Sequence, residues 1–281
     1  MPLRLTESQV AQYRDLGFTA PVRVLSAEEA ATHRAELQAY EAKLGRPVTY
    51  PEKSKCHLLF NWADAIVHNT ALLDALEDLI GPDILLFHFT LQTKEAHRQT
   101  YAQWHQDDAY FHLDPAEQVT AWVALSEASE LSGALRMIPE SHKRGLTDHN
   151  DNVDPESIIG RPQEVAGYGP KDGVLVPLQP GEMSLHHTHT LHSSGPNDSN
   201  DRRIGLTLSY IPTHVRPTGD IRPSALLMRG RDKYGYYETE TRLDPSSSPE
   251  ARRQAHYRAA GLYYKLSGTS QLSAAAAAAA A

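Results

Sequence analysis

The sequence is poor in cysteine, in basic runs and in long apolar stretches. Its 281 residues include one cysteine, Cys56, which excludes an intramolecular disulfide framework and a zinc site held by several thiolates. Acidic residues outnumber basic ones by 35 to 27, and no segment has the basic run typical of nucleic-acid-binding proteins. No apolar run approaches the roughly 18 residues of a membrane span, and the N-terminus lacks a signal-peptide core. We therefore expect a cytoplasmic protein that binds neither nucleic acid nor membrane.

The remaining composition is that of an ordinary globular protein. Hydrophobic residues make up 40% of the chain and charged residues 22%, so disorder and collagen-like structure are excluded. The length suits one large domain or two small ones, and we place a single domain at residues 1–272. Residues 274–281 are all alanine and are interpreted as a cloning remnant or as residues of unassigned identity. Fifteen histidines against one cysteine indicate that any bound metal is held by imidazole and carboxylate.

The sequence pattern of residues 1–82 predicts a helical N-terminal part. Thr6 and Gln9 have the spacing of a capping box before the first helix, and Gly17 ends it. The apolar spacing places the helices at about 6–16, 26–43 and 69–80.

The periodicity changes to two after residue 83. Between residues 85 and 94, the odd positions are apolar and the even positions are polar, namely His88, Thr90, Gln92 and Lys94. This alternation predicts a strand with one apolar and one polar face. The polar face either meets water or lines a site inside a barrel, and this segment alone favours neither.

Several short strands follow, separated by clusters of turn residues. They are predicted at residues 118–125, 134–138, 173–177, 183–187 and 203–212. Helices followed by many short strands indicate an α+β protein with a jelly-roll or barrel core at about residues 83–215, completed by C-terminal elements. The long acidic segment 145–171 is too long for a hairpin, and we expect a lid or binding loop there.

The motif His105-Gln106-Asp107 is the first that carries chemistry. On an extended chain, residues two apart point to the same side, so the sequence predicts an imidazole beside a carboxylate. A distant histidine would complete a 2-His-1-carboxylate triad, which leaves coordination positions open on a ferrous ion. By itself the motif is weak evidence, because such a pair is more often a hydrogen-bonded pair at the surface.

A second group of residues lies between Gly181 and Leu206. Four histidines here could donate the third ligand: His186, His187, His189 and His192. On a regular strand His186 and His187 face opposite sides, so only one of them can face the metal. Arg202 and Arg203 follow ten and eleven residues after His192, and alternation turns only one inward. A buried guanidinium matches a carboxylate well, which suggests an α-keto acid held beside the metal.

Together these motifs resemble the phytanoyl-CoA dioxygenase family of Fe(II)- and 2-oxoglutarate-dependent oxygenases. The resemblance rests on residues 104–107, 119–125, 133–143 and 181–210. It implies a double-stranded β-helix, that is, a jelly-roll or cupin-like barrel, with helices packed on one side. It also implies Fe(II) as cofactor, with 2-oxoglutarate and O2 as co-substrates.

The resemblance assigns roles to individual residues. It makes His105, Asp107 and His192 the catalytic metal ligands and Arg203 the anchor of the distal 2-oxoglutarate carboxylate. Ser194 resembles a hydroxyl that assists the arginine, and Gln92 an amide near the co-substrate. Halogenases of this superfamily lack the carboxylate of Asp107, so its presence implies hydroxylation or a related oxidation.

Neighbouring positions supply further candidates. Thr90 and His88 share the strand face of Gln92, and we assign Thr90 to the co-substrate and His88 to the substrate. Tyr110, just after the metal motif, and His187 are further substrate candidates. Trp122 is expected in the core, and Lys94 and Asp108 are expected at the solvent.

We therefore expect a dioxygenase that oxidises a C–H bond of a small molecule and releases succinate and CO2. The preferred substrate class is a small polar metabolite or natural-product intermediate; phosphonates, amino-acid derivatives and acyl-CoA thioesters are alternatives. The sequence shows no obvious cluster of basic residues that could bind the phosphates of coenzyme A. A cupin-like isomerase and a non-catalytic binding barrel are the competing functions, and Arg203 argues against the first, since an isomerase needs no keto-acid anchor.

Overall fold

The computed structural model describes residues 1–150, 156–159, 164–242, 244 and 246–266. Its helices are α1 (Glu7–Leu16), α2 (Ala27–Leu44), α3 (Asn61–Val67), α4 (Thr70–Ile80), α5 (Asp108–Phe111) and α6 (Pro249–Leu266), with 3-10 turns η1 (Cys56–Leu58) and η2 (Ser141–Arg144). The alanine run at 274–281 lies outside the described residues. Within the described part of the chain, no helix has the length and apolarity needed to cross a membrane.

The predicted N-terminal helices are confirmed, including their ends. Thr6 and Gln9 exchange both hydrogen bonds of a capping box at α1, and Gly17 ends the helix with a φ of 90°. Ser26 and Glu29 form a second capping box at the start of α2. Helix α3, which precedes α4, is not among the predicted helices.

The strands form two principal sheets. A seven-stranded sheet has the order β1-β8-β5-β10-β2-β12-β13, and a four-stranded sheet has the order β3-β9-β6-β7. The bounds of the first sheet are β1 (Phe18–Arg23), β2 (Ile84–Lys94), β5 (Val119–Ala124), β8 (Glu182–His187), β10 (Arg203–Pro212), β12 (Ser224–Arg229) and β13 (Glu238–Thr239); those of the second are β3 (Ala102–His105), β6 (Leu135–Met137), β7 (Val174–Val176) and β9 (His192–Ser194). A further pair joins β4 (Leu113–Asp114) to β11 (Arg216–Pro217). Each predicted strand is present within one or two residues.

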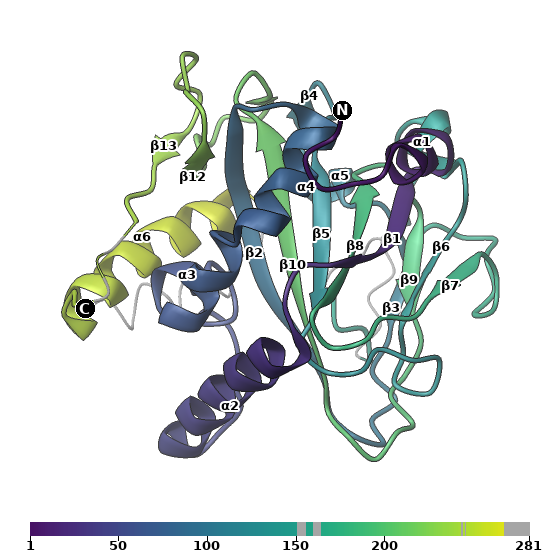
Figure 1. Ribbon diagram of the computed structural model, residues 1–281, viewed down its shortest axis with the longest axis horizontal. Helices are drawn as coiled ribbons and strands as arrows, with labels where there is room; N and C mark the ends of the chain where they lie inside the picture. Colours follow the sequence, from purple (N-terminus) through teal and green to yellow (C-terminus); the bar gives the residue numbers. More distant parts are fainter. Residues whose placement is uncertain (151–155, 160–163, 243, 245, 267–281) are drawn as a thin grey trace.

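Alternation along β10 separates a packed face from a lined face. The even positions belong to one apolar core with residues of α3 and α4: Ile204, Leu206, Leu208 and Tyr210. The odd positions Arg203, Thr207 and Ser209 line a cavity together with residues of the small sheet. In Figure 1, α3 and α4 lie to one side of β10 and the small sheet lies to the other. The polar face of strand 85–94 therefore lines a site rather than meeting water.

A buried ion pair ties the C-terminal segment to the body of the protein. Glu240 accepts hydrogen bonds from Lys55, from Ser224 at 2.7 Å and from the ring of His57 at 2.8 Å. Its pKa is lowered to about 2: burial would raise it, but Lys55 and His57 outweigh burial. This cluster fixes the chain between β13 and α6, and α6 in turn brings Tyr263 to the cavity.

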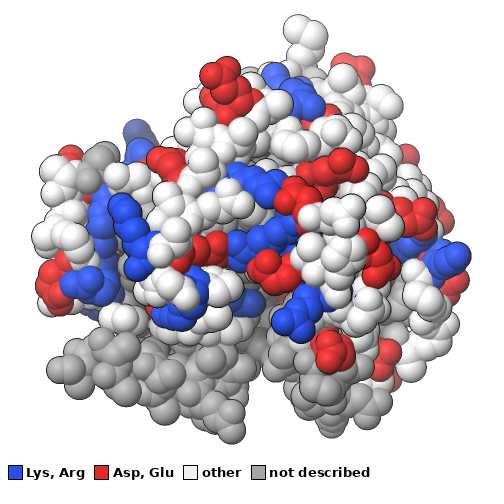
Figure 2. Space-filling view, turned by 90° about the horizontal axis from the view of Figure 1, so that it is seen from below, with Lys and Arg blue, Asp and Glu red and all other residues white. Residues whose placement is uncertain are grey.

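Charges of both signs are interspersed on the surface. The face in Figure 2 shows Lys and Arg side chains next to Asp and Glu side chains, without a continuous basic patch. Ion pairs such as Arg34–Asp201 and Arg258–Glu238 join exposed charges of opposite sign.

Candidate functional site

Two histidines meet across a pair of antiparallel strands. Strand β3 ends at His105, β9 begins at His192, and these residues are direct cross-strand partners. Their ring centroids are 4.1 Å apart. The small sheet thus places two residues that are far apart in sequence side by side.

Backbone carbonyls orient both rings. Nδ1 of His105 lies 2.8 Å from the carbonyl oxygen of Gln103, and Nδ1 of His192 lies 2.9 Å from that of Thr190. A nitrogen facing a carbonyl carries the proton, so in each ring Nε2 keeps its lone pair. This is the tautomer that a metal ligand requires, held by a hydrogen bond on the other nitrogen.

Asp107 completes the group, although not from an extended chain. Strand β3 ends at His105, and Asp107 has helical angles (φ −62°, ψ −34°) at the start of α5. The expectation of one continuous strand through the motif is wrong; a turn brings the carboxylate to the histidines instead. Oδ1 of Asp107 lies 3.8 Å from Nε2 of His105 and 3.8 Å from Nε2 of His192. The three ligand atoms lie within 4.8 Å of one another.

Burial sets the protonation states of this triad. It lowers the pKa of His105, and it lowers the pKa of His192 well below the usual range, with His105 adding to the effect. Burial would raise the pKa of Asp107, but His192, His186 and His105 hold it well below its usual range. Neutral imidazoles and an ionised carboxylate are the forms that bind a metal, so the residues fit a ferrous ion.

Gln106 fixes the turn between the ligands. Its amide donates to the carbonyl oxygens of Gly145 at 2.9 Å and His189 at 2.7 Å, and its oxygen accepts from the backbone N–H of Thr147 at 2.7 Å. All of its polar atoms are thus used to join the motif to two loops. The middle residue of the motif, Gln106, therefore has a structural role.

Arg203 lines the same cavity as the triad and is 1% exposed. Its Nη1 donates to the carbonyl oxygen of Gly133 at 2.6 Å, and its guanidinium carbon lies 5.1 Å from the ring of Trp122. Burial lowers its pKa to about 9. No carboxylate pairs with it within the described part of the chain. A buried guanidinium without a counter-ion is a site for an anionic guest.

The Arg203 end of the cavity depends on close packing. A Cβ on Gly205 would lie 2.0 Å from Cζ2 of Trp122, so only glycine admits the ring beneath the guanidinium. Trp122 is buried in a core cluster, as expected, and also lines the cavity.

Lys94 is buried rather than solvated, so that expectation is wrong. It pairs in register with Arg203 on the neighbouring strand. Its Nζ donates to Oγ of Ser194 at 2.7 Å and to the carbonyl oxygens of Ser194 and Gly195. Burial, then Arg203, lowers its pKa, whereas the three acceptors around Nζ favour the protonated amine that donates to all of them. Because Ser194 Oγ accepts from Lys94, its own proton is available to a guest in the cavity.

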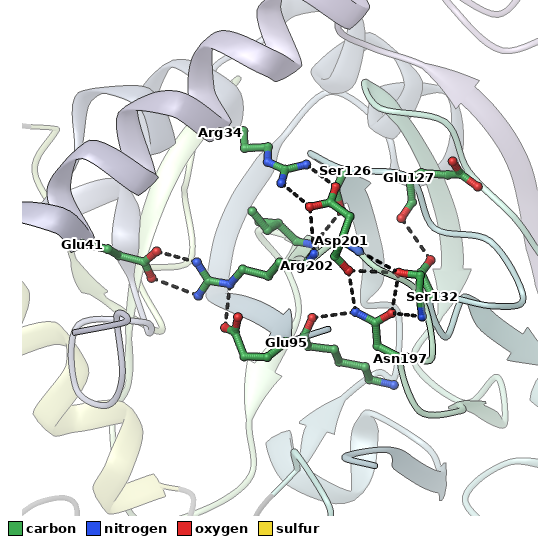
Figure 3. A network of polar contacts seen from close by, with 12 residues as sticks. Arg34, Glu41, Glu95, Ser126, Glu127, Ser132, Asn197, Asp201 and Arg202 are labelled. Carbon is green, nitrogen blue, oxygen red and sulfur yellow. Dashed lines mark hydrogen bonds and ion pairs between the residues drawn. The ribbon is translucent and has the colours of Figure 1, made fainter. Parts of the chain in front are cut away.

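Arg202 points away from the cavity, as alternation predicts. Figure 3 shows it between Glu41 of α2 and Glu95, which follows β2. Beside it, Arg34 of α2 forms two hydrogen bonds with Asp201, at 2.6 and 2.7 Å. These ion pairs fasten the start of β10, and therefore Arg203, to helix α2.

The cavity has a volume of ≈ 100 Å³, which is small beside the several hundred Å³ of pockets for drug-sized ligands. Predicted site residues that line it are His88, Thr90, Gln92, His105, Asp107, Tyr110, His192, Ser194 and Arg203. Strand register orders part of this wall: Arg203 faces Lys94, and Ser209 faces His88. Ser209 lies six positions after Arg203 along β10, a span of roughly 20 Å. Arg203 and His88 therefore mark opposite ends of the polar wall.

His187 is the predicted site residue that the structure does not bring to the cavity. It lies on the other face of β8, where its ring packs near His142 and His189 and burial lowers its pKa to about 4. His186 lines the cavity instead. Asp108, expected at the solvent, is buried and pairs with His189 at 2.9 Å.

Several lining residues come from segments without a sequence motif. Tyr50 and Tyr263 both line the cavity. Tyr263, on α6, stacks on His88 with ring centroids 3.6 Å apart. Ile158 and Ile159 also line it; they belong to the segment 145–171 expected to form a binding loop, of which residues 151–155 and 160–163 are not described. Phe111, which follows Tyr110, lines the cavity too.

Comparison with known proteins identifies the family. The family model described as phytanoyl-CoA dioxygenase (PhyH) matches residues 13–205. The chain is 30% identical over 251 residues to a probable alpha-ketoglutarate-dependent hypophosphite dioxygenase of Stutzerimonas stutzeri, covering 82% of this chain and 84% of that protein. It is 26% identical over 194 residues to L-proline trans-4-hydroxylase of Streptomyces griseoviridis, covering 62% and 72%.

Solved structures agree with this assignment. The non-heme monooxygenase ThoJ in its apo form superposes with a TM-score of 0.81 at 32% identity, over 93% of this chain and 98% of that one. CytC3 with Fe(II) and alpha-ketoglutarate shares the fold, with a TM-score of 0.64 at 19% identity over 88% and 95% of the two chains. The chain belongs to the phytanoyl-CoA dioxygenase family and is an Fe(II)- and 2-oxoglutarate-dependent dioxygenase.

Proposed function

We propose that this enzyme hydroxylates, or otherwise oxidises, a C–H bond of a small polar metabolite or natural-product intermediate, with release of succinate and CO2. One observation carries the proposal: three buried ligand atoms converge in a cavity that is also lined by a buried arginine, and no carboxylate among the described residues pairs with that arginine. We also propose that the two facing sheets form a double-stranded β-helix, because the cavity is lined from both.

The residues that line the cavity have separate roles in holding the metal and the co-substrate. His105, Asp107 and His192 would hold Fe(II), which supplies oxygen activation coupled to decarboxylation of the keto acid. Arg203 binds the distal carboxylate of 2-oxoglutarate, and Ser194, held by Lys94, donates a hydrogen bond at the same end. Gln92 lies two residues along β2 from Lys94 and borders the co-substrate. The apolar cavity walls exclude water from the reacting groups.

The opposite end of the polar wall is proposed for the substrate. His88 and Thr90 lie there, joined by a 2.7 Å hydrogen bond, and Tyr110 and Tyr263 border the same cavity. Because Thr90 contacts His88, we now place it with the substrate rather than with the co-substrate. His187, which lies outside the cavity, is not part of the proposed substrate site.

A small substrate agrees with the cavity and with the relatives. A volume of ≈ 100 Å³ leaves little room beyond a bound keto acid. Three relatives that align with 62–82% of this chain are named for hypophosphite, L-proline and methylphosphonate, which are small polar molecules. The competing isomerase function gives no role to the unpaired charge of Arg203.

The test is succinate formation by purified protein supplied with Fe(II), ascorbate and 2-oxoglutarate. A panel containing hypophosphite, methylphosphonate, L-proline and small neutral metabolites should include a compound that raises succinate release and gains one oxygen atom by mass spectrometry. An Asp107→Ala variant is the control. Succinate release no greater than that of the variant, with every compound and without any, would refute the proposed function.

A further inference from the structure

A fourth histidine adjoins the triad without belonging to it. His186 of β8 is 1% exposed and lines the cavity. Its Nε2 lies 3.5 Å from Oδ2 of Asp107, and its ring centroid lies 4.6 Å from that of His192. None of the roles assigned above uses this side chain.

The two oxygens of Asp107 have different surroundings. Oδ1 lies 3.8 Å from the Nε2 atoms of both His105 and His192, so it faces the point where the ligands converge. Oδ2 faces the large sheet, where it accepts a hydrogen bond from Oγ1 of Thr120 at 2.6 Å. The carboxylate is therefore held with one oxygen towards the metal position and one towards the protein.

Thr120 and His186 approach Oδ2 together for a topological reason. They are direct partners in the antiparallel pairing of β5 with β8. Directly paired residues project from the same face of a sheet. Two neighbouring strands thus present a hydroxyl and an imidazole to the same carboxylate oxygen.

The ring of His186 has unused hydrogen-bonding capacity. Neither of its nitrogens has a hydrogen-bond partner among the described residues, despite full burial. A neutral imidazole always carries one N–H, and a buried donor without a partner is costly to retain. The nearest carboxylate oxygen is Oδ2 of Asp107, just beyond a normal hydrogen bond.

We propose that His186 is a positioning residue that, with Thr120, holds Oδ2 of Asp107 so that only Oδ1 binds the metal. Its Nε2–H donates to Oδ2 once a metal fixes the carboxylate. A one-oxygen Asp107 leaves three of six coordination positions for the keto acid and O2, whereas a two-oxygen Asp107 would occupy one of them. This inference rests on the proposed function, because it presumes that the triad binds iron.

The test compares four variants of the full chain: His186→Phe, His186→Gln, Thr120→Val and Ser184→Ala. Ser184 is the matched control, since it is a buried polar residue two positions from His186 on the same strand face and its hydroxyl has no partner among the described residues. The probe is Co(II), titrated into metal-free protein by calorimetry. Crystal structures of the Co(II) forms then give the distances from the metal to both Asp107 oxygens.

We expect His186→Phe and Thr120→Val each to weaken Co(II) binding about tenfold, at the lower end of the effect of removing an outer hydrogen bond from a metal ligand. In His186→Phe both oxygens of Asp107 should approach the metal. His186→Gln, whose amide replaces the N–H, should restore affinity and one-oxygen binding, and Ser184→Ala should match the wild type.

Wild-type Co(II) affinity in His186→Phe, or equal loss in His186→Phe and His186→Gln, would overturn the role of this hydrogen bond. Either result, obtained with a wild-type protein that binds Co(II) and releases succinate, leaves the proposed function standing. A wild-type protein that neither binds Co(II) nor releases succinate would instead refute the proposed function itself.

Discussion

Replacing Arg203 with methionine tests the co-substrate site through stability as well as through binding. The guanidinium is 1% exposed, and burial lowers its pKa to about 9. No carboxylate of the described residues offsets this charge, and a buried charge without a partner costs several kcal/mol. Without bound 2-oxoglutarate, the charge of Arg203 therefore lowers the free energy of unfolding.

The expected stability of Arg203→Met follows from two opposing changes. Apolar replacement of buried charged groups has stabilised other proteins by about 1–4 kcal/mol. Against this, the carbonyl of Gly133 loses its 2.6 Å hydrogen bond, at a cost of about 1–3 kcal/mol. The stability of the variant without ligand should thus lie between about 2 kcal/mol below and about 3 kcal/mol above that of the wild type, with a shift of about 2–4 °C in Tm per kcal/mol.

Binding of 2-oxoglutarate should change in the opposite direction. Truncating one partner of a buried, hydrogen-bonded charge pair costs about 2–5 kcal/mol, which corresponds to roughly 30- to 3,000-fold weaker binding. A ligand at 100 times its Kd stabilises a protein by about 2.7 kcal/mol. At that concentration the wild type should show this gain, and Arg203→Met should gain at most about 0.9 kcal/mol.

Thermal unfolding of the Co(II)-loaded proteins, with and without 2-oxoglutarate, measures both quantities. Arg203→Lys should fall between the wild type and Arg203→Met, because an ammonium keeps the charge but loses the two-pronged contact. If Arg203→Met is several kcal/mol less stable without ligand yet keeps the full thermal shift, Arg203 has a structural role and the reasoning is wrong.

Four further variants test other parts of the structure. Asp107→Ala should abolish high-affinity Co(II) binding by calorimetry and reduce succinate release to background; full retention of either would remove Asp107 from the triad. Lys94→Met should raise KM for 2-oxoglutarate about tenfold, because Ser194 loses its donor, and an unchanged KM would contradict that link. Arg202→Ala should lower the free energy of unfolding in urea by about 2 kcal/mol, since it breaks partly buried ion pairs, with little effect on KM for 2-oxoglutarate; an unchanged stability would contradict the fastening of α2. The pKa of Glu240 is about 2 in the folded protein against an ordinary 4.5, so its stabilisation of about 3 kcal/mol is complete above pH 4.5 and is lost as the pH falls towards 2. Glu240→Gln should remove this acid dependence from pH-dependent unfolding curves, and identical acid limbs in both proteins would refute it.

The sequence predicted those features that depend on residues close together in the chain, namely strand faces and helix ends. The alternation from Leu85 to Lys94 predicted a strand with a polar face, and the capping pairs located the N-terminal helices. The same alternation separated Arg202 from Arg203. Helix α6 has no comparable signal, since small or polar residues such as Ala260 and His256 provide much of its buried surface.

What the sequence could not supply was register between distant strands. Residues 186–192 hold four histidines, and only the pairing of β8 with β5 shows that His186 faces Asp107 while His187 turns away. Lys94 appeared solvated for a similar reason, because lysine is usually exposed and its partners lie about a hundred positions later in the chain. The turn at Asp107 also escaped the pattern, which assumed a strand through the motif.

Two buried charged residues, Glu240 and Arg203, differ in whether a group of opposite charge lies beside them. Glu240 lies deep in the fold with Lys55 and His57 around it, so its charge is matched and it ties the C-terminal segment in place. Arg203 is equally buried but has no such match among the described residues. An unmatched buried charge costs several kcal/mol, and a bound ligand of opposite charge removes that cost. The difference between these two clusters, rather than burial itself, distinguishes a structural ion pair from a binding site in this chain.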